Sequence, residues 1–119
     1  MYCPLSNDSP APFSRRGPHH RENKMKGYWI AHVTVTDPQA YQAYTELAPE
    51  ILKSFGAKLL ARGGNSRVLE GQPGRDRHVV IEFPSYQDAL NCYHSEAYQH
   101  AITYRADAAL AQVVIVEGI

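Results

Sequence analysis

The sequence lacks the features that mark several specialised classes of protein. Its two cysteines, Cys3 and Cys92, are too few for a disulfide framework and have no metal-site spacing. Basic and acidic residues number 12 each, so no net charge attracts nucleic acid or an anionic membrane. No apolar run reaches the length of a membrane span or a signal peptide. We therefore expect a cytoplasmic protein without a nucleic-acid or membrane partner.

The first 24 residues contain four prolines, several serines and a basic cluster, but no apolar periodicity. This composition predicts a disordered N-terminal extension over 1–24. Its pair His19 and His20 is too small a set for a metal site. We expect residues 25–119 to form the single folded domain.

The first half of this domain begins with a strand at 27–35, which is aromatic and β-branched. Apolar residues then recur every three or four positions over 40–55, which predicts an amphipathic helix that ends at Gly56. Pro49 lies inside this helix, where its missing N–H should kink the helix or divide it into two.

The second half contains two more strands, at 58–62 and 77–83, with a brief hairpin arm predicted at 66–70 between them. Ser85 and Ser95 are placed to begin two helices. The second of these helices should run on to Ala109, and a last strand should follow at 113–117.

The order β-α-β-β-α-β is that of a ferredoxin-like α+β fold, a four-stranded antiparallel sheet with helices on one face. We expect strands 27–35 and 77–83 to be central, parallel neighbours. Alternation assigns the two faces of these strands. The helix face should carry Trp29, Ala31, Val33, Val35, Val79, Ile81 and Phe83. The uncovered face should carry Tyr28, Ile30, His32, Thr34, His78, Val80 and Glu82.

This uncovered face is too apolar to be left in water and too polar for a dry core. Two copies packed face to face would cover it and close a barrel with a lined cavity. We therefore predict a homodimeric α/β barrel.

Several motifs in sequence order resemble the domain of unknown function 1330 family of the dimeric α/β-barrel superfamily. They are KGYWIA (26–31), TDPQAY (36–41), LAP (47–49), RGG (62–64), VLEG (68–71), VVIEFPS (79–85), YHSEAY (93–98) and VEG (116–118). The resemblance covers 25–119 and implies the fold and a homodimer, with no particular reaction. The superfamily includes enzymes that act on small ring compounds without a bound cofactor, haem-binding members and stress-induced proteins, so the fold does not specify a function.

The best chemical set in the sequence is His32, Glu82 and Arg62, which we expect to meet on the uncovered face. A carboxylate can orient a histidine as a general base, and an arginine can hold a carboxylate or enolate oxygen. The alternative is an ion pair of Glu82 with Arg62 inside the barrel. His32, His78 and Glu82 could form a metal set of two histidines and one carboxylate, but His78 lies at the far end of its strand, so no metal is expected.

Six further residues are candidates to bind a ligand: Tyr28, Tyr41, Tyr44, Tyr93, Ser95 and Tyr98. Phenol groups and a hydroxyl could line the mouth of a pocket. Alternatively, tyrosines at helical spacing pack at the edge of the hydrophobic core with the hydroxyl in water, and Ser95 caps a helix.

Two functions follow from these observations. In the first, the barrel cavity binds or transforms a small, partly apolar oxygenated compound without a bound cofactor, with His32 as base. In the second, the protein is a non-catalytic dimeric binding or stress-associated protein, and the same polar residues hold the barrel together.

Overall fold

The computed structural model describes residues 25–119, so the extension expected over 1–24 lies outside the described residues. Seven elements follow one another along the chain. They are β1 (Gly27–Val35), α1 (Pro38–Ser54), β2 (Lys58–Arg62), β3 (Arg77–Phe83), α2 (Tyr86–His94), α3 (Glu96–Ile102) and β4 (Ala109–Glu117). The ferredoxin-like α+β fold is confirmed, with its second helix split in two.

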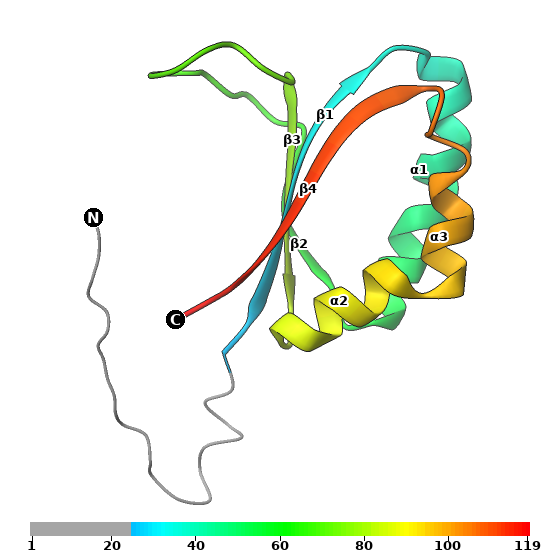
Figure 1. Ribbon diagram of the computed structural model, residues 1–119, viewed down its shortest axis with the longest axis vertical. Helices are drawn as coiled ribbons and strands as arrows, with labels where there is room; N and C mark the ends of the chain where they lie inside the picture. Colours follow the sequence, from blue (N-terminus) through cyan, green and yellow to red (C-terminus); the bar gives the residue numbers. More distant parts are fainter. Residues whose placement is uncertain (1–24) are drawn as a thin grey trace, which may run out of the picture.

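The four strands form one sheet in the order β2-β3-β1-β4, and all three helices cover the same face of it (Figure 1). Every pair of neighbours is antiparallel, and Trp29 is paired with Ile81 across β1 and β3. The expected parallel pairing of β1 and β3 is therefore wrong. Helix α1 returns the chain so that β2 runs in the direction of β1, and β3, the antiparallel partner of β2, must run opposite to both.

Helix α1 begins and ends where the sequence predicts. The Asp37 side chain accepts a hydrogen bond from the Ala40 N–H at 3.2 Å, and Pro38 occupies the first turn. Gly56 follows the helix with a φ of +87°, a conformation that favours glycine. The predicted division at Pro49 does not occur, because packing of the buried Ala48 and Leu52 against the core holds the helix continuous.

The loop 63–76 replaces the hairpin arm predicted at 66–70. Strand β2 pairs with β3 on one side only, and residues 66–70 form no strand along its outer edge. Leu69, an apolar residue of this segment, is 84 % exposed. Burial of apolar side chains therefore does not hold the segment as a strand.

The last helix is shorter and the last strand longer than predicted. Ser95 begins α3 by accepting a hydrogen bond from the Tyr98 N–H at 3.1 Å, as expected. The helix ends at Ile102, however, and the Ala108 carbonyl accepts hydrogen bonds from the backbone N–H groups of Thr36 and Asp37. These bonds tie the chain to the end of β1 and start β4 at residue 109, beside Val35.

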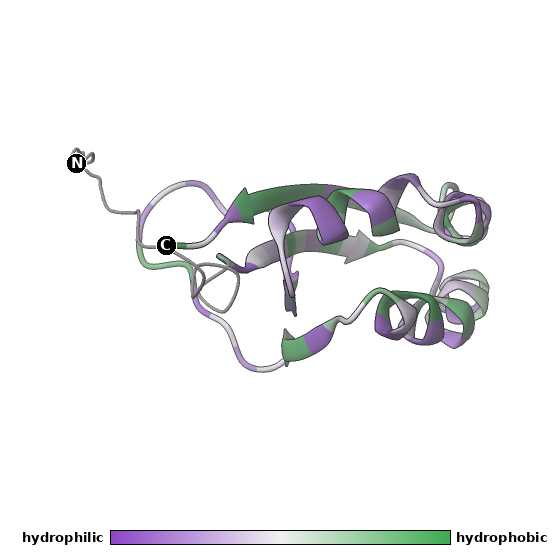
Figure 2. Cartoon of the chain, turned by 90° about the horizontal axis from the view of Figure 1, so that it is seen from below, coloured by the Kyte–Doolittle hydropathy of each residue, from purple (hydrophilic) through white to green (hydrophobic). Residues whose placement is uncertain are grey.

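The two faces of the sheet are divided as the alternation predicts. Trp29, Ala31, Val33, Ile81 and Phe83 are buried between the sheet and the helices. The helices carry hydrophilic and hydrophobic residues side by side, as amphipathic helices do (Figure 2). Within 25–119, no helix has the length and apolar character needed to cross a membrane.

Candidate functional site

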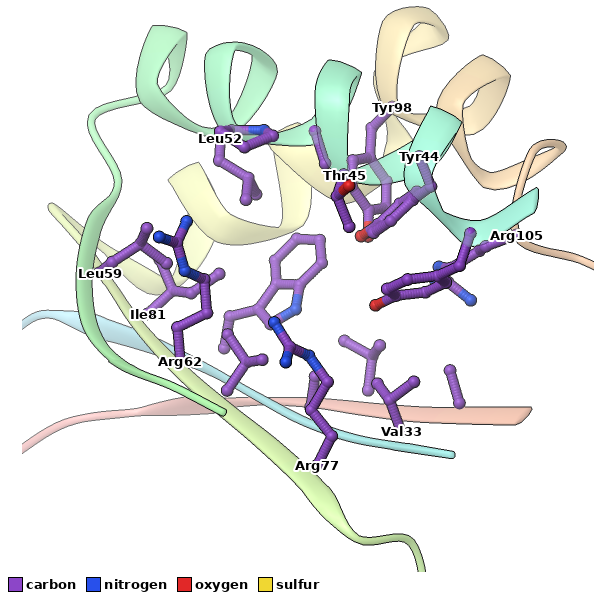
Figure 3. Close-up of a pocket in the computed structure, with 18 residues that line it drawn as sticks. Val33, Tyr44, Thr45, Leu52, Leu59, Arg62, Arg77, Ile81, Tyr98 and Arg105 are labelled. Atoms are coloured by element: carbon purple, nitrogen blue, oxygen red, sulfur yellow. The ribbon is translucent and has the colours of Figure 1, made fainter. Parts of the chain in front are cut away.

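A pocket of about 390 Å³ lies between the sheet and the helices (Figure 3). Strands β1 to β4 form its floor, α1 and α3 form its roof, and Arg105 reaches it from the turn before β4. Its aromatic lining consists of Trp29, Tyr41, Tyr44 and Tyr98, and its cationic lining of Arg62, Arg77 and Arg105. The volume is within the range of about 300 to 1,000 Å³ that is usual for small-molecule sites.

One end of the pocket is built from phenol groups and a guanidinium. The hydroxyl oxygens of Tyr44 and Tyr98 lie 2.5 Å apart, and both point into the space between α1 and the sheet. The Arg105 guanidinium lies beside both tyrosines, and its central carbon is 5.1 Å from the centre of the Tyr44 ring. This distance allows a cation–π contact.

The surroundings at this end keep Tyr98 neutral and Arg105 charged. Burial, reinforced by Tyr44, raises the pKa of Tyr98 above its ordinary value. Burial alone would lower the pKa of Arg105, but its interactions with Tyr98 and Tyr44 raise it above the ordinary value. Tyr98 therefore stays a neutral phenol beside the arginine, and one hydroxyl hydrogen of the Tyr44–Tyr98 pair is free to bond an oxygen in the pocket.

Tyr41 and Arg77 extend the same polar end across the sheet. Burial raises the pKa of Tyr41, while the nearby Arg77 and Arg105 act in the opposite direction. The Arg77 guanidinium thus lies close to the Tyr41 side chain. Beneath it lies Gly63, which has a φ of +66° and where a side chain would collide with the Arg77 guanidinium. Glycine at 63 therefore leaves the space that Arg77 occupies.

The other end of the pocket is largely apolar. Leu52 of α1, Leu59 of β2 and Ile81 of β3 line it together, and the Arg62 side chain lies beside Leu59 (Figure 3). Trp29 also lines the pocket, is only 2 % exposed and stacks on Phe83 with ring centres 5.8 Å apart. The pocket therefore has a polar end with Arg77 and Arg105, and a largely apolar end with Arg62 as its one cation.

The predicted set of His32, Glu82 and Arg62 does not assemble within the chain. His32 is paired with His78, whereas Glu82 is paired with Tyr28, four residues further along the strand, or about 13 Å away. Arg62 is paired with Val79 and lines the pocket on the opposite face of the sheet. The register therefore contradicts both the catalytic arrangement and the ion pair of Arg62 with Glu82.

On the uncovered face these residues have other partners. The Nδ1 atoms of His32 and His78 lie 2.9 Å apart, and the Tyr28 hydroxyl donates to Glu82 at 3.4 Å. Within 25–119, no three histidine, cysteine or acidic side chains gather where they could hold a metal ion.

The six candidate ligand-binding residues divide between three places. Tyr41, Tyr44 and Tyr98 line the pocket. Tyr28 lies on the uncovered face, since it is paired with Glu82. Tyr93 packs against the Trp29 ring, and Ser95 caps α3, so neither is part of the pocket lining.

The family's sequence profile, described as Domain of unknown function (DUF1330), matches residues 26–119. The chain belongs to this family. No curated protein matches the chain. The DUF1330 assignment thus supports the fold and leaves the chemistry to be argued from the pocket.

Solved structures similar to this DUF1330 chain share its fold at low sequence identity. A protein of unknown function from Rhodopseudomonas palustris has a TM-score of 0.65 at 16 % identity, over 84 % of this chain and 89 % of its own. A dimeric ferredoxin-like protein of unknown function from Thermobifida fusca has a TM-score of 0.54 at 12 % identity, over 79 % and 92 %. A dimeric protein of unknown function and ferredoxin-like fold from Bacteroides fragilis has a TM-score of 0.53 at 13 % identity, over 77 % and 95 %.

Sequence reasoning missed Arg77, Arg105 and Trp29 as pocket residues. Trp29 and Arg77 occupy the helix-facing set of alternating positions in their strands, and this signal could have placed both beneath the helices. Arg105 carried no such signal, because it was assigned to a helix that in fact ends at Ile102.

Proposed function

We propose that this DUF1330 protein binds a small, partly apolar oxygenated compound, without a bound cofactor, in the pocket between the sheet and the helices. The observation that carries the proposal is the placement of two hydrogen-bonded phenol groups, Tyr44 and Tyr98, beside the cation Arg105 at one end of a partly enclosed, largely apolar space. Pockets with an apolar lining and a few converging polar groups are typical of small-molecule sites.

The composition of the pocket favours binding over acid–base catalysis by the protein. Among the residues of 25–119 that line it, none is a histidine, aspartate, glutamate, lysine or cysteine. A general base must come within hydrogen-bond reach of the proton that it removes. His32 and Glu82 are on the other face of the sheet, so neither can serve a ligand in this pocket. This favours the non-catalytic binding alternative over His32-dependent turnover.

A larger side chain at Thr45 should abolish binding. Thr45 lines the pocket but is exposed, so a phenylalanine there can fill the pocket without disturbing the core. We expect the Thr45→Phe protein to lose at least about tenfold in affinity for any ligand found by ligand-observed NMR with a panel of small phenols, ketones and carboxylic acids.

Gln42→Phe is the matched control, because Gln42 is exposed on the same helix and does not line the pocket. This variant should bind like the unmodified protein. If no member of the panel binds to the unmodified protein, or if Thr45→Phe binds as well as Gln42→Phe, the proposed site is wrong.

We also propose that residues 25–119 form a homodimer through the uncovered face of the sheet. The middle row of that face is apolar, because Ile30 lies between Val80 and Val114 in the strand register. On the edge strand β4, Leu110, Val114 and Val116 are 55 %, 46 % and 44 % exposed. Exposed apolar side chains gathered on one face of a sheet are typical of an interface.

The similar structures support this choice of partner. The proteins from Thermobifida fusca and Bacteroides fragilis are both described as dimeric. A second copy of the same chain carries the same apolar row, so two uncovered faces can cover each other about a two-fold axis.

A further inference from the structure

The charges around the pocket are unbalanced. Arg62, Arg77 and Arg105 all contribute to the lining, and no lining residue within the described part of the chain is acidic. Tyr41 and Tyr98 do not supply the missing negative charge, because burial raises the pKa of both phenols and keeps them protonated. A pocket that collects cations without a protein counter-charge is suited to an anionic ligand.

Arg77 also has a hydrogen-bond donor that the described chain leaves without an acceptor. Its Nε atom is buried and has no hydrogen-bond partner within the described chain. Buried donors are nearly always satisfied, so an isolated one beside a pocket points to an acceptor that the protein does not provide. The Arg77 side chain lies between Tyr41 and Gly63, and the missing side chain of Gly63 leaves the space that its guanidinium occupies.

The form of these donors specifies the kind of anion. A guanidinium presents its N–H groups in a planar fork that matches the two oxygens of a carboxylate. We infer that the ligand is an apolar or aromatic monocarboxylic acid, with its carboxylate against Arg77 and Arg105 and its apolar body toward Leu52, Leu59 and Ile81. This inference rests on the proposed function and adds the chemical class of the ligand.

The orientation follows from the sheet register and from α1. Arg77 begins β3 opposite Val33, near the end of β1, and Tyr41 and Tyr44 lie in the first half of α1, above it. Leu52 lies in the last turns of α1, and Leu59 is paired with Ile81 nearer the other end of the strands. A carboxylate therefore meets Arg77 and Arg105 at one end, and an apolar body meets the largely apolar other end, where Arg62 is the remaining cation.

The test compares benzoate with benzamide, which has nearly the same shape but no charge. Affinities are measured by isothermal titration calorimetry at neutral pH on the whole chain. We expect benzoate to bind at least about tenfold more tightly than benzamide, because hydrogen bonds to charged groups are the stronger ones. In Arg77→Gln, benzoate should lose about 10- to 100-fold in affinity and benzamide much less.

Arg67→Gln is the matched control, since Arg67 is exposed on the loop 63–76 and does not line the pocket. It should leave both affinities unchanged. Arg77→Lys retains the charge without the planar fork, and it should fall between the unmodified protein and Arg77→Gln. Circular dichroism of each variant checks that it is folded.

The outcomes separate this inference from the function on which it rests. Equal binding of benzoate and benzamide, or an unchanged benzoate-to-benzamide ratio in Arg77→Gln and Arg77→Lys, overturns the carboxylate assignment and leaves the pocket as a binding site. If neither compound binds and the wider panel of phenols, ketones and acids also fails, the proposed function fails together with the inference.

Discussion

The Val114→Glu protein should sediment as a monomer at concentrations where the unmodified chain is a dimer. Val114 lies beside Ile30 on the uncovered face and is 46 % exposed in the single chain. A two-fold interface would bury two copies of the new carboxylate without a partner, which costs several kcal/mol. We expect the dissociation constant, measured by analytical ultracentrifugation, to rise by at least about 100-fold.

Leu69→Glu is the control for this experiment. Leu69 is the more exposed residue, at 84 %, but it lies on the loop 63–76 and not on the sheet. Loss of an exposed apolar side chain there should not alter the dimer. A Val114→Glu protein that stays dimeric, or an unmodified chain that is monomeric at micromolar concentration, would contradict the proposed interface.

Replacing Tyr98 should separate its packing from its hydroxyl chemistry. Its side chain is fully buried, and its ring lies 5.0 Å from that of Trp29 in an edge-to-face arrangement. We expect Tyr98→Ala to lower the free energy of unfolding by about 3 to 5 kcal/mol, the usual cost of removing a large buried aromatic ring. Tyr98→Phe keeps the ring and loses only the hydrogen bond to Tyr44 and the contact of its hydroxyl with Arg105, so about 1 kcal/mol should be lost.

Urea unfolding followed by circular dichroism measures both values, at one fixed protein concentration because a dimer's stability depends on it. Tyr98→Phe should nevertheless weaken ligand binding, since a donor at the polar end is lost. If Tyr98→Phe were as unstable as Tyr98→Ala, the hydroxyl cluster would be the main stabilising feature and not the ring packing.

The sequence predicted the fold well because its strands alternate clearly between two faces. Trp29 and Ile81 were assigned to the buried face from alternation alone, and the register places them side by side there. Helix starts were equally readable, because Ser85 and Ser95 each accept a backbone hydrogen bond in the first turn. Alternation and helix caps depend on residues that are close in the sequence, so a single sequence is enough to predict them.

The site was harder to predict because it depends on how strands are aligned. The expected parallel pairing of β1 and β3 places Glu82 near His32, whereas the antiparallel pairing places His78 there. A bulge between Leu59 and Ala61 shifts the register of β2 and turns Arg62 toward the helices. Neither the pairing direction nor a bulge can be inferred from the composition of one strand.

The most direct test of this account is to map a bound ligand onto one or the other face of the sheet by NMR. Trp29 is the single tryptophan of the chain and lines the pocket, whereas His32 and His78 meet on the uncovered face. With the tightest-binding compound of the panel, we expect the indole N–H signal of Trp29 to shift in a saturable manner and the imidazole signals of His32 and His78 to stay in place. Shifts at the two histidines with an unmoved Trp29 would place the ligand on the other face and contradict the account.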